Sequence, residues 1–285
     1  MKIGLVGCGY WGKIILKNLI QLGYKDITVC EKRKIDWDDV GQKFKVVQSY
    51  KFLKCDAVFV VTPPETHYEV CKYFLKKGVN VFCEKPLTLD HVSSAELYKE
   101  AKRSGASLFV DWVFIYNPCV RVLRDIIQDR GKPKNIIANR LNYGPVRKDV
   151  NARWDLASHD VSIATFLLSD TPKSVSWLDF KRNNTSDQND SVVGVLSYED
   201  TNLQINASWE YGKKDRLYSL EFENGFVYWD DNDKTVTDNF TQIEVPNYSP
   251  LHKSIKTFIN NDFDQKQQMN LTLDTTRILE NESKL

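Results

Sequence analysis

The sequence has almost no net charge and no long hydrophobic segment. Its 39 basic and 38 acidic side chains leave a formal charge of +1 over 285 residues, which provides no bulk attraction to nucleic acid or to an anionic membrane. No apolar run approaches the roughly 18 residues that a membrane-spanning helix needs. We therefore expect neither a nucleic-acid partner nor a membrane partner.

Patterns that bind metals are also missing. The six cysteines form no Cys-x-x-Cys pair, and the four histidines do not cluster with other ligand types at metal-binding spacing, so no metal site is predicted. Several cysteines lie in apolar runs, where they pack as small hydrophobic residues.

The run KIGLVG at residues 2–7 is typical of a core strand and not of a cleavable leader. These features predict a cytoplasmic protein.

Two different patterns divide the chain. Residues 1–117 alternate short apolar strands with amphipathic helices, which is typical of a Rossmann domain, an α/β domain with a doubly wound parallel sheet. Several segments within residues 118–285 alternate apolar and polar residues. They predict an α+β domain with a large, mostly antiparallel open sheet, for substrate binding and oligomerisation. The open face needs a cover, so we expect a homodimer or a homotetramer.

The first strand leads into a glycine-rich turn, GCGYWG at residues 7–12. Gly7 permits the tight turn, Gly9 lets the backbone approach a pyrophosphate, and Gly12 lets the following helix pack on the strand. The helix N-terminus offers unpaired N–H groups to phosphate. A glycine turn without a ligand is the alternative, but the strand before it and the helix after it favour a dinucleotide site.

An acidic residue, Glu31, follows this turn by about 20 residues, at the end of the second strand. Its carboxylate is expected to accept hydrogen bonds from the ribose hydroxyls, which favours NAD. Arg33 can instead hold a 2′-phosphate, so NADP stays open, and a solvated basic loop is a third explanation. Tyr10 and Trp11, within the glycine turn, complete the contacts predicted there.

A lysine stands where the strand at residues 79–83 leaves the sheet, in the run Glu84-Lys85-Pro86. Ligands of doubly wound sheets bind outside the carboxyl ends of the strands. Side chains alternate along a strand, so Lys85 can face the cofactor while Glu84 points to the other side. Beside a positively charged nicotinamide, a lysine can take a proton from a substrate hydroxyl or return it to a carbonyl. A solvated lysine at a strand end is the alternative.

The run WDLASHD at residues 154–160 places Asp155 and His159 four residues apart, on one face of a helix. Taken alone, the pattern predicts Asp155 as the N-cap and His159 as a packed histidine. A cap is compatible with catalysis, because a helix that starts at Asp155 holds both side chains rigidly on one face.

In this order, GCGYWG, VTPPETHYEVCKYFLKKGVNVFCEKPLTLD and WDLASHD resemble the Gfo/Idh/MocA oxidoreductase family, and the resemblance covers nearly the whole chain. It implies a site in which Lys85 contacts both nicotinamide and substrate, and which Asp155 and His159 complete from the second domain. Further residues then lie on the cofactor side, namely Thr62, Pro63, His67 and Glu84.

Members of this family transfer a hydride to or from a carbon of a sugar or cyclitol. The form WDLASHDVSI resembles a branch associated with nucleotide sugars, which we take as the most favoured substrates. Arg153, with Arg147 and Lys148 before it, can hold a diphosphate, although a basic surface loop explains these residues equally well. Tyr143 and Trp154 can stack on a sugar or a base, or belong to the core.

Three alternative functions remain at this point. They are a dehydrogenase of free sugars or inositol, a glycosidase that uses bound NAD, and a regulator that senses NAD without catalysis. The regulator predicts the loss of catalytic residues, whereas Lys85, Asp155 and His159 are all present.

Overall fold

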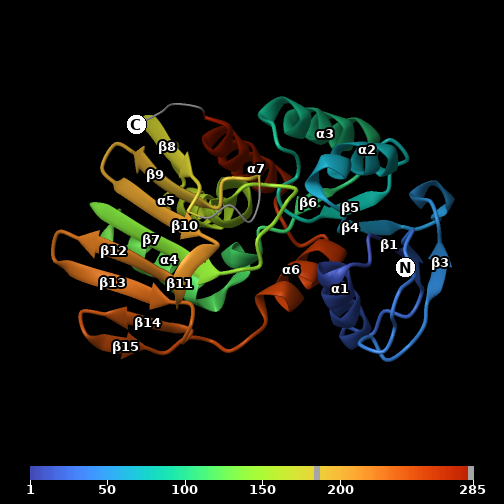
Figure 1. Ribbon diagram of the computed structural model, residues 1–285, viewed down its shortest axis with the longest axis horizontal. Helices are drawn as coiled ribbons and strands as arrows, with labels where there is room; N and C mark the ends of the chain where they lie inside the picture. Colours follow the sequence, from blue (N-terminus) through green and yellow to red (C-terminus); the bar gives the residue numbers. More distant parts are fainter. Residues whose placement is uncertain (183–186, 282–285) are drawn as a thin grey trace. The chain divides into compact units, whose positions relative to one another are not determined.

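The structure, a computed structural model, describes residues 1–182 and 187–281 and contains two compact units (Figure 1). The first unit comprises Met1–Trp112 together with Leu251–Leu273. The second comprises Val113–Pro250 and the residues from Asp274 onward. The domain boundary after residue 117 stays a prediction. The return of residues 251–273 to the first unit was not predicted from the sequence.

A six-stranded parallel sheet forms the centre of the first unit, in the order β3-β2-β1-β4-β5-β6. Its strands are β1 (Ile3–Val6), β2 (Ile27–Cys30), β3 (Lys45–Val47), β4 (Ala57–Val60), β5 (Asn80–Cys83) and β6 (Leu108–Val110). Strands β1 and β4 are buried throughout, because helices cover the sheet. This confirms the predicted doubly wound parallel sheet.

The helices of this unit are α1 (Tyr10–Gln21), α2 (Pro64–Leu75), α3 (His91–Ser104), most of α6 (Pro250–Ile259), residues 265–273 of α7 (Gln265–Glu280), and a short 3₁₀ turn at Tyr50–Phe52. Local sequence sets their ends. Asp90 caps α3 by accepting a hydrogen bond from the Ser93 N–H at 2.7 Å, and Gly105 ends it with φ +74°.

Helix α6 contributes an aromatic ring to the core beside this sheet. The Phe258 ring lies 5.4–5.8 Å, between centroids, from the rings of Phe59, Phe82 and Phe109, which come from β4, β5 and β6. Part of the core of the first unit is therefore supplied by a segment more than 100 residues away in the sequence.

The second unit contains a nine-stranded sheet in the order β15-β14-β13-β12-β7-β10-β9-β8, and β11 also pairs with β7. Its strands are β7 (Asn135–Tyr143), β8 (Ser174–Phe180), β9 (Ser191–Ser197), β10 (Asn202–Ser208), β11 (Glu210–Asp215), β12 (Leu217–Phe222), β13 (Gly225–Asp230), β14 (Thr235–Asp238) and β15 (Thr241–Ile243). Strands β7 and β10 run parallel, and the other described pairs are antiparallel. The mostly antiparallel sheet is thus confirmed.

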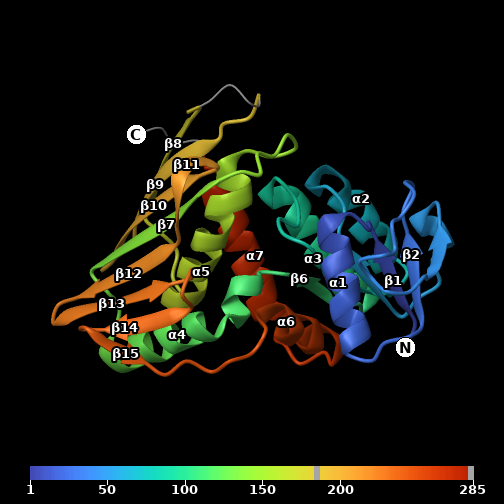
Figure 2. The same ribbon diagram turned by 60° about the horizontal axis from the view of Figure 1, so that its bottom comes forward.

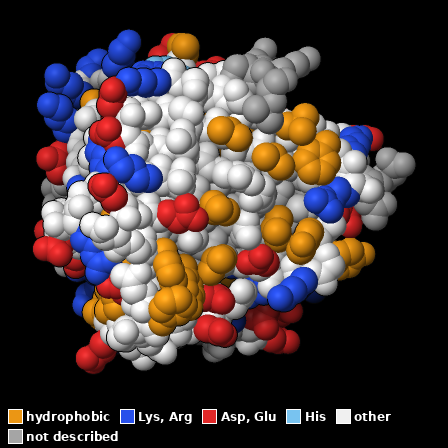
Figure 3. Space-filling model, turned by 90° about the vertical axis from the view of Figure 1, so that its left-hand side faces the viewer, with side chains coloured by type: hydrophobic (Ala, Val, Ile, Leu, Met, Phe, Trp, Pro, Cys, Tyr) orange, Lys and Arg blue, Asp and Glu red, His pale blue; other side chains and the backbone are white. Residues whose placement is uncertain are grey.

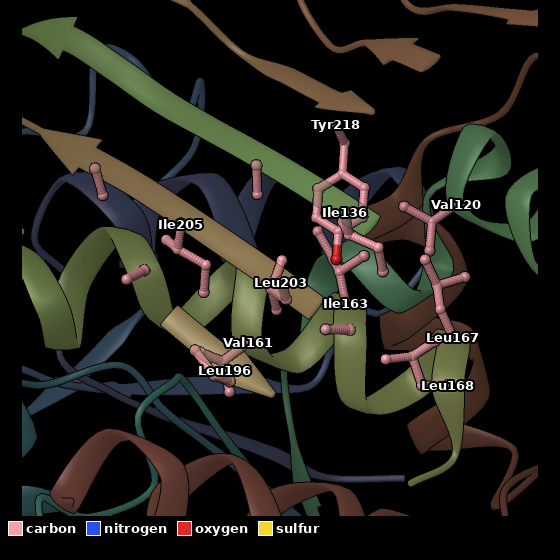
Figure 4. Close-up of a cluster of buried hydrophobic side chains, with 14 of the residues drawn as sticks. Val120, Ile136, Val161, Ile163, Leu167, Leu168, Leu196, Leu203, Ile205 and Tyr218 are labelled. Atoms are coloured by element: carbon pink, nitrogen blue, oxygen red, sulfur yellow. The ribbon is translucent and has the colours of Figure 1, made fainter. Parts of the chain in front are cut away.

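Helices cover one face of this second sheet (Figure 2). They are α4 (Pro118–Arg130), α5 (Ser158–Leu168), residues 274–280 of α7, a 3₁₀ turn at Val113–Tyr116 and a π-helical turn at Arg153–Ala157. The core lies between sheet and helices, where Ile136 and Leu203 from the strands meet Val161 and Leu167 from α5 (Figure 4). Burial of such side chains is the main favourable term in folding.

The other face of the second sheet carries exposed apolar side chains. Ile137, Leu178 and Val195 alternate with inward-facing residues and are 36%, 51% and 37% exposed. Apolar side chains are spread over the face of the molecule that Figure 3 shows. The described helices include none that is long and apolar enough to cross a membrane.

Gly194 is a position in this sheet that has no space for a side chain. It pairs with Trp177 on the neighbouring strand, and a Cβ at Gly194 would lie 2.2 Å from the buried indole ring. We expect Gly194→Ala to lower the free energy of unfolding by about 1–3 kcal/mol, because the ring must move. Gly212→Ala is the matched control, since its Cβ meets nothing within 4 Å. Urea unfolding measures both, and equal stability of the two variants would contradict this packing.

Candidate functional site

The three glycines of the turn after β1 have different surroundings. Gly7 has φ +91°, and a Cβ there would lie 2.4 Å from the Val61 carbonyl oxygen. A Cβ on Gly12 would lie 2.2 Å from the carbonyl oxygen of Gly7. Both are therefore required by the packing of the turn itself. Gly9 differs, because only Arg33 Nη2, at 3.6 Å, lies near the place of its Cβ. The backbone at Gly9 is thus accessible to a ligand, which fits the close approach of a pyrophosphate.

Glu31 is held against this turn by backbone N–H groups. Its Oε2 accepts a hydrogen bond from the Cys8 N–H at 2.9 Å, and its Oε1 accepts from Lys32 at 2.9 Å and Arg33 at 3.0 Å. Partial burial opposes ionisation of Glu31, but the bonds from Arg33 and Cys8 outweigh it and lower its pKa. A carboxylate therefore stands beside the glycine turn, while the Arg33 side chain is 79% exposed.

Trp11 connects the glycine turn to the end of β5. Its indole N–H donates a hydrogen bond to Glu84 Oε1, and the Lys85 backbone N–H donates to Glu84 Oε2 at 3.3 Å. The structure thus brings together three residues predicted for the cofactor side. Tyr10, next to Trp11, is 84% exposed.

His67 bridges two loops at this edge of the sheet. It is buried, with Nδ1 2.8 Å from the Pro86 carbonyl oxygen and Nε2 2.7 Å from that of Thr62. The carbonyl oxygen of Pro63 accepts a hydrogen bond from the Thr66 N–H at 2.9 Å, which starts α2. His67 therefore holds the loop after β4 against the loop that carries Lys85. Contact of His67, Thr62 or Pro63 with a cofactor stays a prediction.

Asp111 also belongs to this edge, and sequence reasoning missed it. It follows β6 directly, is 1% exposed, and its Oδ1 accepts a hydrogen bond from the Ser254 hydroxyl. Burial raises its pKa. A signal was present in the run SLFVDW, where an acidic residue follows a buried strand at the edge that binds ligands.

In the second unit, Asp155 lies inside a helical segment and is not its N-cap. Ala152 is already helical, and the Asn151 side-chain oxygen accepts a hydrogen bond from the Trp154 N–H at 3.0 Å. The expected helix start at Asp155 is therefore wrong, because Asn151 supplies the capping oxygen. The π-helical turn at Arg153–Ala157 then leads into α5, and such turns are frequent at functional sites.

The Asp155 carboxylate is held by one cation and one indole. Arg147 Nη1 donates to Oδ1 at 2.9 Å, and Trp209 Nε1 donates to Oδ2 at 3.2 Å. Arg147 also donates to Asp149 through Nε at 2.9 Å. Asp155 is thus kept in one orientation by residues from the loop after β7 and from the end of β10.

His159 is positioned by packing one turn further on. The His159 and Phe114 rings are T-shaped, with centroids 4.9 Å apart, and the Arg140 guanidinium carbon lies over the Phe114 ring, 4.5 Å from its centroid. Arg140 is buried and donates two hydrogen bonds, of 2.9 and 2.7 Å, to the buried Asp160 next to His159. His159 therefore packs against a ring that also contacts a buried ion pair.

The three residues predicted to bind substrate differ in exposure. Arg153 donates to Asp179 and, at 3.1 Å, to the carbonyl oxygens of Leu279 and Asn281, so it joins three segments of its own unit. Trp154 packs against the core, and Tyr143 is 76% exposed. Binding of a substrate by any of them stays a prediction.

The predicted catalytic residues belong to different units. Lys85 is in the first, and Asp155 and His159 are in the second, so their joint site stays a prediction. Among the residues that the structure describes, no group of three or more His, Cys, Asp or Glu side chains is arranged to hold a metal ion.

Comparison with known proteins agrees with the architecture of both units. Residues 1–112 match the Gfo/Idh/MocA model, described as an oxidoreductase family with an NAD-binding Rossmann fold. The chain is 31% identical to UDP-N-acetylglucosamine 3-dehydrogenase from Acidithiobacillus ferrooxidans over 180 residues, which cover 61% of this chain and 56% of that protein. In sequence, the chain therefore matches little more than half the length of this relative.

The structural similarity extends further than the sequence match. A solved structure of the same Acidithiobacillus enzyme has a TM-score of 0.86 at 20% identity and covers 98% of this chain and 95% of its own. The WlbA dehydrogenase from Bordetella pertussis, in complex with NADH and UDP-GlcNAcA, has a TM-score of 0.82 at 17% identity, with 98% and 94% covered. Myo-inositol 2-dehydrogenase from Thermotoga maritima is 22% identical over 293 residues, which cover 92% of this chain and 88% of that protein.

The contacts of Arg153 predict a loss of stability when it is removed. Arg153 and Asp179 form an ion pair in which both side chains are largely buried. Replacing either residue by Ala is expected to cost about 3 kcal/mol of unfolding free energy, since one charge remains without its partner. The double variant should lose less than the sum of the two. Denaturant unfolding of all four proteins measures this coupling, and strictly additive losses would show that the two residues act independently.

Proposed function

We propose that the protein is a member of the Gfo/Idh/MocA oxidoreductase family, whose model matches residues 1–112, and that it transfers a hydride between NAD and a carbon of a nucleotide-activated sugar. The observation that carries this proposal is one connected arrangement in the first unit. It contains an accessible backbone at Gly9, an ionised Glu31 and a hydrogen-bonded link from Trp11 through Glu84 to Lys85.

The glycine turn would hold the pyrophosphate of the cofactor. The N-terminus of α1 directs unpaired N–H groups towards it, and Gly9 leaves the necessary space. Glu31 would accept hydrogen bonds from the ribose hydroxyls, and its negative charge disfavours a 2′-phosphate. The exposed Arg33 is the group that would favour NADP. Bound NAD would supply the carbon that accepts or gives the hydride.

This chain's own side chains would handle the proton. Lys85 and His159 are the two groups proposed to exchange a proton with the reacting hydroxyl or carbonyl. Asp155 would orient the substrate or its catalytic partner, because Arg147 and Trp209 already hold its carboxylate in place. Such rigid support is what positioning of a reacting group requires.

The names of the relatives favour a nucleotide sugar. The Acidithiobacillus enzyme is named for UDP-N-acetylglucosamine, and the Bordetella structure contains UDP-GlcNAcA. In this chain, the exposed Tyr143 offers a ring that can stack on a base or a sugar. Free inositol is the second candidate, because a relative named for myo-inositol matches 92% of this chain.

We also propose that the protein is located in the cytoplasm.

Lys85→Ala is expected to abolish hydride transfer while NAD still binds. The change removes the proposed proton carrier and leaves the glycine turn intact. Gly9→Val is the control with the reverse expectation. The valine side chain would occupy the place of the pyrophosphate and prevent NAD from binding. Calorimetric titration with NAD measures binding, and absorbance of the reduced nicotinamide measures turnover.

The substrates for this assay are UDP-sugars, dTDP-sugars, free sugars and inositol, each tested with NAD and with NADP. Near-normal turnover of Lys85→Ala on the substrate found would overturn the proposed site. Activity on free inositol alone would overturn the nucleotide-sugar assignment.

The uncovered face of the second sheet is proposed to join copies of the chain into a homodimer or a homotetramer. Leu178, which is 51% exposed there, is a suitable probe. Leu178→Arg should shift the protein towards the monomer in analytical ultracentrifugation, because it buries a charge in the interface. Val92→Arg is the control, since Val92 is 66% exposed but lies on α3 of the other unit. A wild-type monomer would rule out this role of the sheet.

A further inference from the structure

Two acidic side chains lie next to each other at the edge that carries Lys85. Phe82 and Phe109 are paired residues of β5 and β6, and their rings stack at 5.3 Å. Side chains alternate along strands, so Glu84 and Asp111, two residues further on, project from the same face. The Asp111 N–H donates to the Cys83 carbonyl oxygen at 2.9 Å, which continues the pairing beyond the strand ends. Neighbouring strands are about 4.8 Å apart, so the two carboxyl groups are close neighbours.

The surroundings of the two carboxyl groups do not favour two negative charges. Asp111 is 1% exposed, and its Oδ2 has no hydrogen-bond partner among the described residues. Glu84 is partly buried and accepts from Trp11 and from the Lys85 backbone. Burial and the charge of Asp111 raise the pKa of Glu84, whereas Trp11 and Lys85 act in the opposite direction. The group that faces Asp111 from α6, Ser254, is uncharged.

Two ionised carboxylates side by side, one with an unpartnered buried oxygen, would be strongly unfavourable. One bound proton removes the repulsion and gives that oxygen a hydrogen to donate. We propose that Glu84 and Asp111 share a single proton, and that the resulting single negative charge positions Lys85. The part that concerns Lys85 rests on the proposed function, and the shared proton does not.

In this proposal, Glu84 and Asp111 have different roles. Glu84 holds the Lys85 backbone through its Oε2 and faces the glycine turn through Trp11. Asp111 limits the charge of the pair, because its like charge adds to the effect of burial and raises the pKa of Glu84 further. Both act through Lys85 and are positioning residues.

Carboxyl carbon-13 NMR of the full chain, without substrate or cofactor, tests the shared proton. In the wild type, the Glu84 signal should titrate at a higher pH than that of the exposed Glu69. Asp111→Asn should lower the Glu84 midpoint by about 1–3 pH units, because the like charge is removed. Trp11→Phe should raise it, because the ionised form loses a donor. Glu69→Gln is the control and should leave it unchanged.

An ordinary midpoint for Glu84 in the wild type, or no shift in Asp111→Asn, would overturn the shared proton. If Asp111→Asn fails to fold, the wild-type titration still decides, because two coupled carboxyl groups each show both titration steps, and a single step in the Glu84 signal would overturn the shared proton.

The kinetics of hydride transfer test the effect on Lys85. The double variant Glu84→Gln, Asp111→Asn has no negative charge in the pair, so kcat should fall by about tenfold or more while NAD binding measured by calorimetry stays unchanged. Asp111→Asn keeps one negative charge on Glu84 and should lose less of kcat than the double variant. An unchanged kcat in the double variant would overturn the role of the pair towards Lys85. Full activity of Lys85→Ala would instead overturn the proposed function, and the NMR titration would still judge the shared proton.

Discussion

The first unit depends on how closely helix α1 can approach strand β1. Gly12 lies against the Gly7 carbonyl oxygen with no space for a Cβ, and this contact fixes where α1 begins. From that position, Trp11 reaches the end of β5 and donates to Glu84. A side chain at Gly12 would have to move α1 away from the strand, and with it the Trp11 bond to Glu84. The glycine turn and the loop that carries Lys85 are thus linked through one packing contact.

The second unit holds its polar residues in a different way. Arg140 and Asp160 form a buried pair joined by two hydrogen bonds, and both Arg140 and His159 contact the Phe114 ring. Buried pairs of this kind contribute more to a defined geometry than to net stability. The orientation of His159 is therefore maintained by packing against an aromatic ring.

Local patterns in the sequence predicted most of the architecture and several site residues. Glycine spacing and strand alternation are local, so the parallel sheet, the second sheet and the position of Glu31 could be derived from them. Contacts between distant segments could not. Asp111 meets Glu84 across 27 residues, and Arg153 meets Asp179 across 26. The helix start at Asp155 was mistaken because Asn151, four residues earlier, had the same capping chemistry.

Because α6 belongs to the first unit, no N-terminal fragment of the chain that ends before α6 contains the whole core of that unit. The chain passes between the units at residues 112, 250 and 273, so the second unit is an insertion with two points of attachment before the C-terminal segment. A fragment that ends at residue 112 would lack Phe258, the ring that three strands of the parallel sheet share. The nucleotide-binding unit is thus discontinuous in the gene. Exchanging it between relatives requires three junctions, and a single cut would leave its core incomplete.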